Sequence, residues 1–406
     1  MSKTSVAIIG TVGIPAKYGG FETLAEHLVE HLGNDLNLSV YCTTKKYGQA
    51  ERQSHYKGAR LIYLPFDANG IQSIIYDCVS ILHALLYADV LLILGVSGGF
   101  VLPFVRWFTR KKIIISIDGI EWKRHKWSKL AKWYLWAAEW MAVRYSHADI
   151  SDNESIQNYT AIRYKTLSHI IEYGADHTMA VTPTPADRLQ YPVLTKAYAF
   201  SVCRIEPENN IHITLEAFAQ LTRHTLVLVG NWANSEYGIE LQNKYKAYSN
   251  LHLLDPIYDQ RTLDLLRSNC LVYIHGHSAG GTNPSLVEAM YLGLPIISFD
   301  VSYNRTTTEN KALFFKTARE LVYHIQHTSV AALKRQAIVM KTIAHRRYSW
   351  AVITRKYAFL VRLVMQTNTK SSLKSAAGSQ LPSDWLLQAE LGHLQSPVYF
   401  YEDKSI

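Results

Sequence analysis

Short apolar runs that end in glycine or a polar residue recur along the first 118 residues. They predict strands over 5–10, 38–43, 61–66, 90–95 and 112–118. The segments between them have a helical period, as in 21–32, where apolar residues recur every three or four positions. Strands that alternate with helices are typical of a parallel sheet covered on both faces.

The alternation starts again near residue 197. Further strands are predicted over 197–203, 224–230, 251–255, 270–276 and 294–300, with helices between them such as 211–221. We therefore predict an α/β protein of two successive doubly wound, Rossmann-like domains, separated in the proline-rich stretch 180–192. In such a pair, a ligand is expected in the central cleft that the carboxyl ends of both sheets face.

The predicted bounds are 1–185 for the first domain, 193–348 for the second, 349–366 for a closing helix and 367–406 for a tail without an assigned role. The most membrane-like segment, 90–105, is shorter than the roughly 20 residues of a spanning helix. Glycines and a proline also interrupt it, so we predict a strand, a loop and the start of a helix there.

Composition narrows the class of protein. Hydrophobic residues at 48% and charged residues at 18% exclude large-scale disorder. The net charge of +9 does not by itself indicate nucleic-acid binding, and no nucleic-acid-binding module is recognised. The four cysteines are far apart and form no CxxC pair, which favours reduced thiols in the cytosol. The N-terminus lacks the features of a signal peptide.

A glycine-rich turn joins the first predicted strand to the first helix. Its glycines, Gly10, Gly13, Gly19 and Gly20, allow a close approach of backbone to ligand, and the helix N-terminus offers N–H groups to an anion. The spacing matches neither GxGxxG nor GxxxxGK[ST], which argues against a dinucleotide cofactor. We expect Gly19 and Gly20 near a phosphate; an ordinary turn is the alternative.

The stretch HGHSAGGTNPSLVEAM occupies the equivalent place in the second domain, at 275–290. Asn283 is predicted to cap a helix that begins at Pro284, after a loop containing Gly280, Gly281 and Thr282. That loop exposes N–H groups where the helix dipole favours negative charge. Glu288 is a candidate acceptor of hydrogen bonds from sugar hydroxyls; a solvent-facing glutamate is the alternative.

No metal site is predicted. We expect His275 and His277 to point to opposite sides of the strand end, and no third ligand lies nearby. No DxD pair, which would hold a metal-bound nucleotide, occurs in the chain.

Seven segments taken together resemble a bacterial glycosyltransferase of the GT-B fold, in retaining family 4, and within it the rhamnosyltransferase-like branch. They are GTVGIPAKYGGFETLAEHL, IDGIEWKRHKW, RIEPENNI, GNWANSEYG, LLDPIYD, HGHSAGGTNPSLVEAM and FDVSYNRTTTENKA, in the expected order. The resemblance implies that the first domain binds the acceptor and the second the nucleotide sugar. It also implies that the closing helix crosses back to the first domain.

The resemblance assigns residue roles, with two departures. Arg204 matches an arginine that grips the donor diphosphate, but Asn209 replaces the lysine five residues later. Glu288 matches the second of two glutamates and is expected at the nucleotide ribose, whereas the first glutamate is replaced by Gly280. Backbone groups of the 280–282 loop, with Asn283, would then contact the donor sugar. The branch implies dTDP-rhamnose as co-substrate.

Asp118 stands where family members often carry a histidine, and it is the candidate for orienting or deprotonating the acceptor hydroxyl. A turn aspartate before Gly119 is the alternative. The catalytic candidates are thus Asp118, Arg204 and Glu288. The family implies transfer with retention and without metal, in which Arg204 and the glycine loops stabilise the leaving phosphate.

The segment 121–144 combines four lysines and two arginines with five tryptophans. A basic, aromatic helix suits an anionic membrane surface; a solvated basic face over a tryptophan-rich core is the alternative. The candidate acceptor or membrane surface is Glu121, Trp122, Lys123, Arg124 and Lys126.

These inferences predict a cytoplasmic enzyme, peripheral on the inner face of the cytoplasmic membrane. It would transfer a sugar to a lipid-linked or saccharide acceptor during surface polysaccharide synthesis. The alternative is a non-catalytic subunit that binds a nucleotide sugar or a partner, which the departures at Asn209 and Gly280 motivate.

Overall fold

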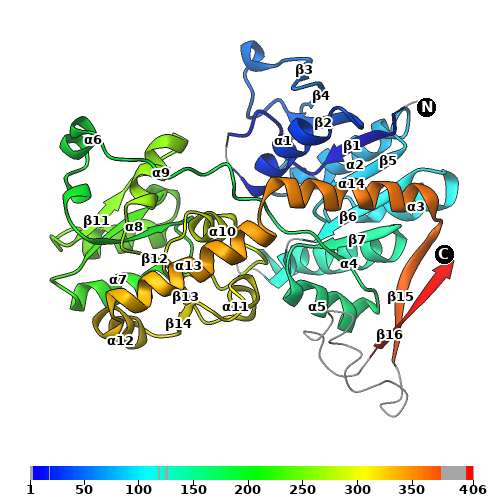
Figure 1. Ribbon diagram of the computed structural model, residues 1–406. Coiled ribbons are helices and arrows are strands. Elements are labelled where there is room, and N and C mark those ends of the chain that lie inside the picture. The colour runs from blue at the N-terminus through cyan, green and yellow to red at the C-terminus, as the bar shows by residue number, and fades with distance from the viewer. Residues whose placement is uncertain (1–2, 18, 118, 124–126, 376–398, 406) are drawn as a thin grey trace. The chain divides into compact units, whose positions relative to one another are not determined.

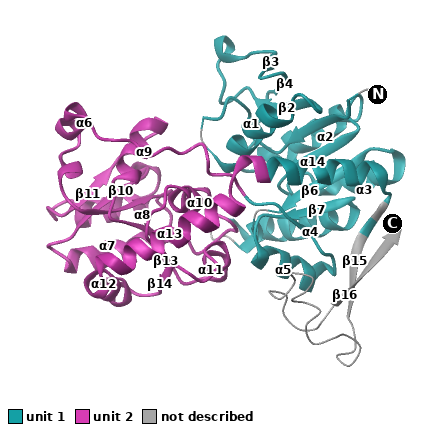
Figure 2. Cartoon of the chain, viewed as in Figure 1, with its two compact units in different colours: residues 1–172, 353–406 teal, residues 173–352 magenta. Residues whose placement is uncertain are grey.

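The computed structural model describes residues 3–17, 19–117, 119–123, 127–375 and 399–405 (Figure 1). The chain divides into two compact units (Figure 2). Unit 1 contains residues 1–172 and 353–406, and unit 2 contains residues 173–352. Each unit is built on a largely parallel sheet, which confirms the predicted α/β class and its two parallel-sheet domains.

The sheet of unit 1 has eight strands in the order β3-β4-β2-β1-β5-β6-β7-β8. Its central strands β1, β5 and β6 are continuous apolar runs and are buried, as expected for a parallel sheet covered on both faces. Only β3 pairs in antiparallel fashion, with β4. The strands are β1 (Ser5–Ile9), β2 (Asn37–Thr43), β3 (His55–Tyr56), β4 (Ala59–Leu64), β5 (Val90–Leu94), β6 (Lys112–Ile117), β7 (Ala148–Ser151) and β8 (His169–Ile170).

The first helix of unit 1 buries an apolar stripe. In α1, the predicted periodic positions Leu24, Leu28 and Leu32 are buried. The helices are α1 (Gly20–Leu32), α2 (Gln72–Ala84), α3 (Leu102–Phe108), α4 (Lys129–Tyr145) and α5 (Glu154–Tyr164). The closing helix α14 (Trp350–Gln366) starts in unit 2 and has residues 353–366 in unit 1. It is followed by an antiparallel pair, β15 (Thr369–Ser375) and β16 (Tyr399–Ser405).

The sheet of unit 2 has six parallel strands in the order β11-β10-β9-β12-β13-β14. They are β9 (Tyr198–Val202), β10 (Thr225–Val229), β11 (Leu251–Leu254), β12 (Val272–His275), β13 (Ile296–Phe299) and β14 (Leu313–Phe315). The helices are α6 (Pro185–Gln190), α7 (Ile211–Gln220), α8 (Glu236–Tyr245), α9 (Gln260–Ser268), α10 (Pro284–Tyr291), α11 (Ser302–Thr307), α12 (Ala318–His327) and α13 (Val330–Arg347).

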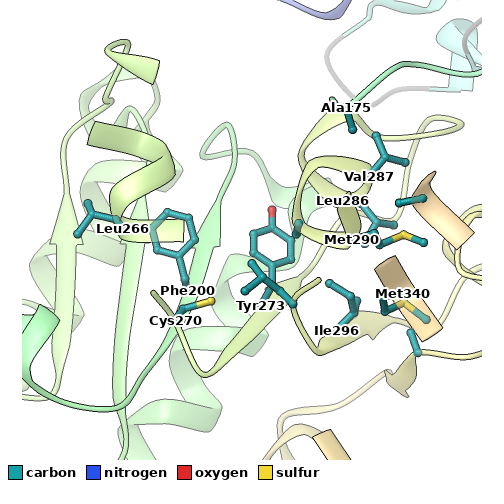
Figure 3. Close-up of a cluster of buried hydrophobic side chains, with 14 of the residues drawn as sticks. Ala175, Phe200, Leu266, Cys270, Tyr273, Leu286, Val287, Met290, Ile296 and Met340 are labelled. Carbon is teal, nitrogen blue, oxygen red and sulfur yellow. The ribbon is translucent and has the colours of Figure 1, made fainter. Parts of the chain in front are cut away.

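A buried cluster under β12 and α10 forms one half of the core of unit 2 (Figure 3). Phe200 and Leu266 lie on one side of Tyr273, and Leu286 and Met290 of α10 lie on the other. Close packing of this kind limits how far α10 and the end of β12 can shift. The loop between β12 and α10 is therefore held at both of its ends.

Two details of the fold bear on the sequence predictions. Unit 2 begins at Tyr173, ahead of the predicted linker 180–192, because Ala175 packs in its core and donates a backbone hydrogen bond to Tyr348 at 2.7 Å. The segment 90–105 forms β5, a short turn and α3, as predicted. Among the described residues, no helix is both long and apolar enough to cross a membrane.

Candidate functional site

Two loops of unit 2 meet at the carboxyl edge of its sheet. Arg204 follows β9, residues 276–283 follow β12, and these two strands are neighbours. Hydrogen bonds join the loops: the backbone N–H and the hydroxyl of Ser278 donate to the Glu208 carbonyl at 2.9 and 2.8 Å. The amide of Asn210 donates to the Gly276 carbonyl at 2.8 Å. Ligands bind at this edge in doubly wound sheets.

The close approach of the two loops explains why residue 276 is a glycine and what Asn209 does in place of the family's lysine. A Cβ atom on Gly276 would lie 2.2 Å from the carbonyl oxygen of Asn209, so only glycine fits. Asn209 is buried, and its side-chain amide donates to the carbonyl of Arg204 at 2.7 Å. The residue in the place of the family's lysine therefore supports the loop that carries Arg204.

Arg204 presents its guanidinium at the surface. The side chain is half exposed, and its nearest ion-pair partner, Glu206, lies 3.7 Å away. An exposed pair at this distance contributes little to stability, so the guanidinium can turn to an incoming anion.

The loop ahead of α10 combines an open glycine with a formed helix cap. Gly280 has a φ of +115°, and a Cβ there would meet no atom within 4 Å. The side-chain oxygen of Asn283 accepts the backbone N–H of Ser285 at 3.1 Å and its hydroxyl at 2.8 Å. The predicted cap at Asn283 and helix start at Pro284 are confirmed. The donor-binding roles of Gly280, Gly281, Thr282 and Asn283 stay predictions.

Glu288 lies in a buried charge network, so the solvent-facing alternative is wrong. Its Oε2 is 2.6 Å from Nη1 of Arg267, whose side chain is 1% exposed. Its Oε1 is 3.2 Å from Nε2 of His177. Asp264 is a second carboxylate near Arg267, at 3.7 Å.

Trp350 fixes the orientation of His177. The indole Nε1 donates to His177 Nδ1 at 3.2 Å, so Nδ1 is an acceptor and Nε2 carries the hydrogen that points to Glu288. Burial acts to raise the pKa of Glu288, but the charge of Arg267 and the contacts with His177 bring it below its usual value. Glu288 is therefore ionised at neutral pH, with 13% of its side chain exposed.

Sequence reasoning missed Arg267, His177 and Trp350. Arg267 gave one weak signal, since it lies between the apolar pair 265–266 and the apolar run 270–274, where burial of a charged residue requires a partner. The sequence did not indicate that Arg267 and His177 are partners of Glu288, because they lie 21 and 111 residues away from it along the chain.

The glycine turn of unit 1 contacts carboxylates of the chain itself. Glu22 accepts the backbone N–H of Val12 at 2.7 Å and the hydroxyl of Thr11 at 3.1 Å. Gly19 has a φ of +135°, and a Cβ there would lie 1.9 Å from the Glu22 carboxylate. An anion near Gly19 would thus meet a carboxyl group, although burial raises the pKa of Glu22. The expected phosphate contacts of Gly19 and Gly20 remain predictions.

Asp118, Arg124 and Lys126 lie outside the described residues. Another acidic residue of unit 1, Asp77 of α2, was not singled out from the sequence. It is 3% exposed, and no described residue forms a hydrogen bond with its carboxyl group. Burial raises its pKa to about 8. Its Cβ would be 3.0 Å from a Cβ on Gly98, in the loop that follows β5.

The predicted acceptor or membrane surface at 121–123 is largely engaged within unit 1. Glu121 accepts the indole N–H of Trp127 at 2.9 Å. Trp122 donates to the hydroxyl of Tyr159 at 3.1 Å, and the guanidinium of Arg163 lies 5.1 Å from its ring centroid. Lys123 is exposed. The role of residues 121–126 as an acceptor or membrane surface stays a prediction.

His275 and His277 do not point apart. Their rings stack with centroids 4.4 Å apart, because residues two apart in extended backbone share a face. The expectation of opposite sides was wrong. Among the described residues, no three His, Cys, Asp or Glu side chains gather as they would around a metal ion.

Two families match the chain, one in each half. Residues 3–176 match a family described as a domain of unknown function, DUF1972. Residues 186–329 match the family described as "Glycosyl transferases group 1". This second match contains Arg204, Arg267 and Glu288. None of the curated proteins matches the chain.

Solved glycosyltransferase structures share the fold. Sucrose-phosphate synthase from Thermosynechococcus elongatus has a TM-score of 0.76 at 16% identity, over 90% of this chain and 100% of that one. HepE from Anabaena, in complex with UDP-glucose, has 0.68 at 15%, over 88% and 99%. The catalytic domain of starch synthase IV from Arabidopsis thaliana, bound to ADP and acarbose, has 0.63 at 13%, over 90% and 100%.

The fold is therefore that of GT-B glycosyltransferases. The family match in unit 2, together with this fold, supports glycosyl transfer as the general activity.

Proposed function

We propose that the chain transfers L-rhamnose from dTDP-rhamnose, bound by unit 2, to a lipid-linked or saccharide acceptor. The observation that carries the proposal is the ionised Glu288 carboxylate, held by Arg267 at 2.6 Å and His177 at 3.2 Å. A carboxylate fixed in this way is a ready acceptor for the two hydroxyls of a nucleotide ribose. Its place one turn into α10 sets it beside the N–H groups at the start of that helix.

Arg204 and the loop ahead of α10 would bind the diphosphate of the donor. In the reaction, the bond between the anomeric carbon and the phosphate oxygen breaks, and negative charge grows on the leaving diphosphate. A guanidinium and preorganised N–H groups stabilise this charge more in the transition state than in the ground state. We expect transfer without metal and with retention. EDTA should then leave the rate unchanged, and NMR of the product should show the donor's anomeric configuration.

Gly280 supports a deoxy sugar as the transferred group. With φ at +115° and open space beyond it, the loop offers backbone groups where a glutamate side chain would otherwise contact sugar hydroxyls. A sugar with fewer or differently placed hydroxyls suits this arrangement. UDP-glucose, the ligand of the HepE structure, is the natural comparison donor.

A donor screen tests the proposal. Thermal shift and product formation would be measured with dTDP-rhamnose, dTDP-glucose and UDP-glucose, for the wild type and Glu288→Gln. We expect dTDP-rhamnose to be turned over, and the variant to bind it about tenfold more weakly or worse. Unchanged affinity in the variant would remove Glu288 from the ribose contact. Binding of a donor without turnover would favour the non-catalytic subunit instead.

We also propose that the protein acts in surface polysaccharide synthesis as a cytoplasmic enzyme, peripheral on the inner face of the membrane. The basic, aromatic segment 121–144 supports this location, because a lipid-linked acceptor keeps its sugar close to the bilayer. Transfer to membrane extracts that contain lipid-linked saccharides, compared with water-soluble saccharides, would identify the acceptor class.

A further inference from the structure

We propose that unit 1 binds anionic bilayers through the exposed faces of α3 and α4, here called the α3–α4 surface. The surface consists of Phe104, Trp107 and Phe108 on α3, and Leu130, Trp133, Trp136 and Trp140 on α4. The proposal rests on the membrane location given above and is independent of the donor sugar. It places the membrane contact on α3 and on α4, which overlaps the predicted segment 121–144, and not on the candidate residues 121–126.

Helix α3 exposes three large aromatic side chains on one face. Phe104, Trp107 and Phe108 are spaced by three and four residues, which puts them on the same side of the helix. Each exposes more than half of its surface, with Phe108 at 77%. The opposite face, with Leu102 and Val105, is buried. The aromatic residues are thus surplus to the core of unit 1.

Helix α4 packs against α3 and carries a second stripe of exposed apolar side chains. Leu130, Trp133, Trp136 and Trp140 follow a stripe of three- and four-residue steps, and their exposed fractions run from 46% to 77%. The ring of Trp107 lies edge-on against Tyr145 near the end of α4, with centroids 5.4 Å apart, which joins the two helices. Apolar exposure on this scale marks an interaction site in a folded protein.

The charge around these aromatic residues selects the partner. Residues 99–147 hold ten Lys or Arg and three Asp or Glu, a net charge of +7, compared with +9 for the whole chain. One of the three acidic residues, Glu139, is 1% exposed and accepts a hydrogen bond from Tyr159. Arg110, Lys129 and Arg144 are exposed, and each lies within four residues of Phe108, Trp133 or Trp140 along the chain.

Tryptophans that expose an apolar body and an N–H tip, flanked by cations, fit the headgroup layer of an anionic membrane. A protein partner would need a matching apolar and acidic surface, whereas anionic phospholipid supplies both properties without further specificity. A lipid surface is therefore the occupant that the exposed aromatic residues and the charge together favour.

Vesicle binding by the full-length protein tests the charge. Cosedimentation would use vesicles of phosphatidylcholine alone or mixed with phosphatidylglycerol. We expect binding only to the mixed vesicles, weakened by salt, and at least about 30-fold weaker for the double variant Arg110→Glu, Lys129→Glu. The control with the same charge change, Lys334→Glu with Arg335→Glu on exposed positions of α13, should bind like the wild type. Equal loss in both variants would overturn the proposal.

A second pair of variants tests the aromatic residues. Phe108→Ser with Trp133→Ser should weaken binding at least about tenfold. The control Leu189→Ser with Phe359→Ser removes two large apolar side chains elsewhere, whose exposed fractions are 84% and 57%. This control should bind vesicles like the wild type. Lipids brominated in the acyl chain should quench tryptophan fluorescence in the wild type and less so in Trp133→Phe. Absence of quenching would show that the rings do not enter the bilayer and would overturn the proposal.

Two further measurements distinguish a failure of the membrane-surface proposal from a failure of the proposed donor binding and from self-association. The thermal shift caused by dTDP-rhamnose should be the same in all surface variants, so loss of vesicle binding with an intact shift concerns the α3–α4 surface alone. Light scattering reports the oligomeric state. A wild-type dimer that ignores vesicles and dissociates in Phe108→Ser with Trp133→Ser would assign this surface to a second copy of the chain instead.

Discussion

At the scale of single residues, Glu288 and Asp77 show how surroundings decide the charge of a buried acid. Arg267 and His177 keep Glu288 ionised, and their contacts lower its pKa against the effect of burial. Asp77 has no such partner among the described residues, and burial alone raises its pKa to about 8. Desolvation raises the pKa of both carboxyl groups, but charged partners offset this effect at Glu288 and none does so at Asp77 among the described residues.

Removing one partner of the Glu288–Arg267 ion pair should strongly destabilise the protein. Arg267→Met leaves the Glu288 carboxylate buried without its cation, and we expect a loss of about 3–5 kcal/mol in the free energy of unfolding. Urea denaturation would measure it. The double variant Arg267→Met, Glu288→Gln should recover part of that loss, because the charge of Glu288 is then removed, whereas Asp264 still lacks the cation that lies 3.7 Å from it in the wild type. A double variant as unstable as Arg267→Met would show that the loss comes from the packing of Arg267 or from its pair with Asp264, and not from the unpaired charge of Glu288.

Asp77 should make stability fall as pH rises. Its folded pKa lies above the unfolded value, so its contribution to stability is fully present below the unfolded pKa, near 4, and is lost as pH rises through about 8. Asp77→Asn removes this term. We expect its gain in the free energy of unfolding to grow by on the order of 3–4 kcal/mol between pH 5 and pH 8.

Thermal unfolding across this pH range would measure the effect of Asp77→Asn. Asp35→Asn, at an exposed site, is the matched control and should show no such trend. A gain for Asp77→Asn that does not change with pH would mean that the carboxyl group is ionised in the folded protein.

At the scale of elements, the β12–α10 connection is a short loop fixed from both sides. Tyr273 and Leu286 anchor its ends in the core, and the hydrogen bonds of Ser278 tie its middle to the β9 loop. Local rules were sufficient to predict the strand, the glycine loop and the cap. The tie between the two loops could not be predicted, because it depends on β9 and β12 being neighbours in the sheet.

The cap of α10 should be separable from any contact of Asn283 with a donor. Asn283→Ala removes the acceptor for the N–H of Ser285 and should destabilise the protein by about 1 kcal/mol. Asn283→Asp keeps a capping oxygen and should retain stability. Because a carboxylate near the donor phosphates is unfavourable, we expect Asn283→Asp to bind dTDP-rhamnose more weakly at equal stability. Equal affinity for Asn283→Asp and the wild type would place the donor elsewhere.

At the scale of the whole molecule, hydrophobic periodicity was enough to predict two parallel-sheet domains, because the central strands β1, β5, β6, β9 and β12 are apolar and well separated. The pattern did not reveal β7, which has the sequence ADIS. Its Asp149 is buried against Lys370, 2.7 Å away and 221 residues along the chain. Polar residues buried by distant partners carry no local signal, and the network around Glu288 was missed for the same reason.

The position of Trp350 limits how the two halves can be exchanged between proteins. It is one of the first three residues of α14, which belong to unit 2, whereas residues 353–366 of that helix belong to unit 1, and its indole orients His177 within unit 2. A chimera that takes residues 193–348 from this chain would leave behind both Trp350 and His177. Donor recognition should survive transplantation only when the junctions are set outside residues 173–352. Recombination at the apparent linker would yield a folded sheet whose Glu288 has lost one of its two supports.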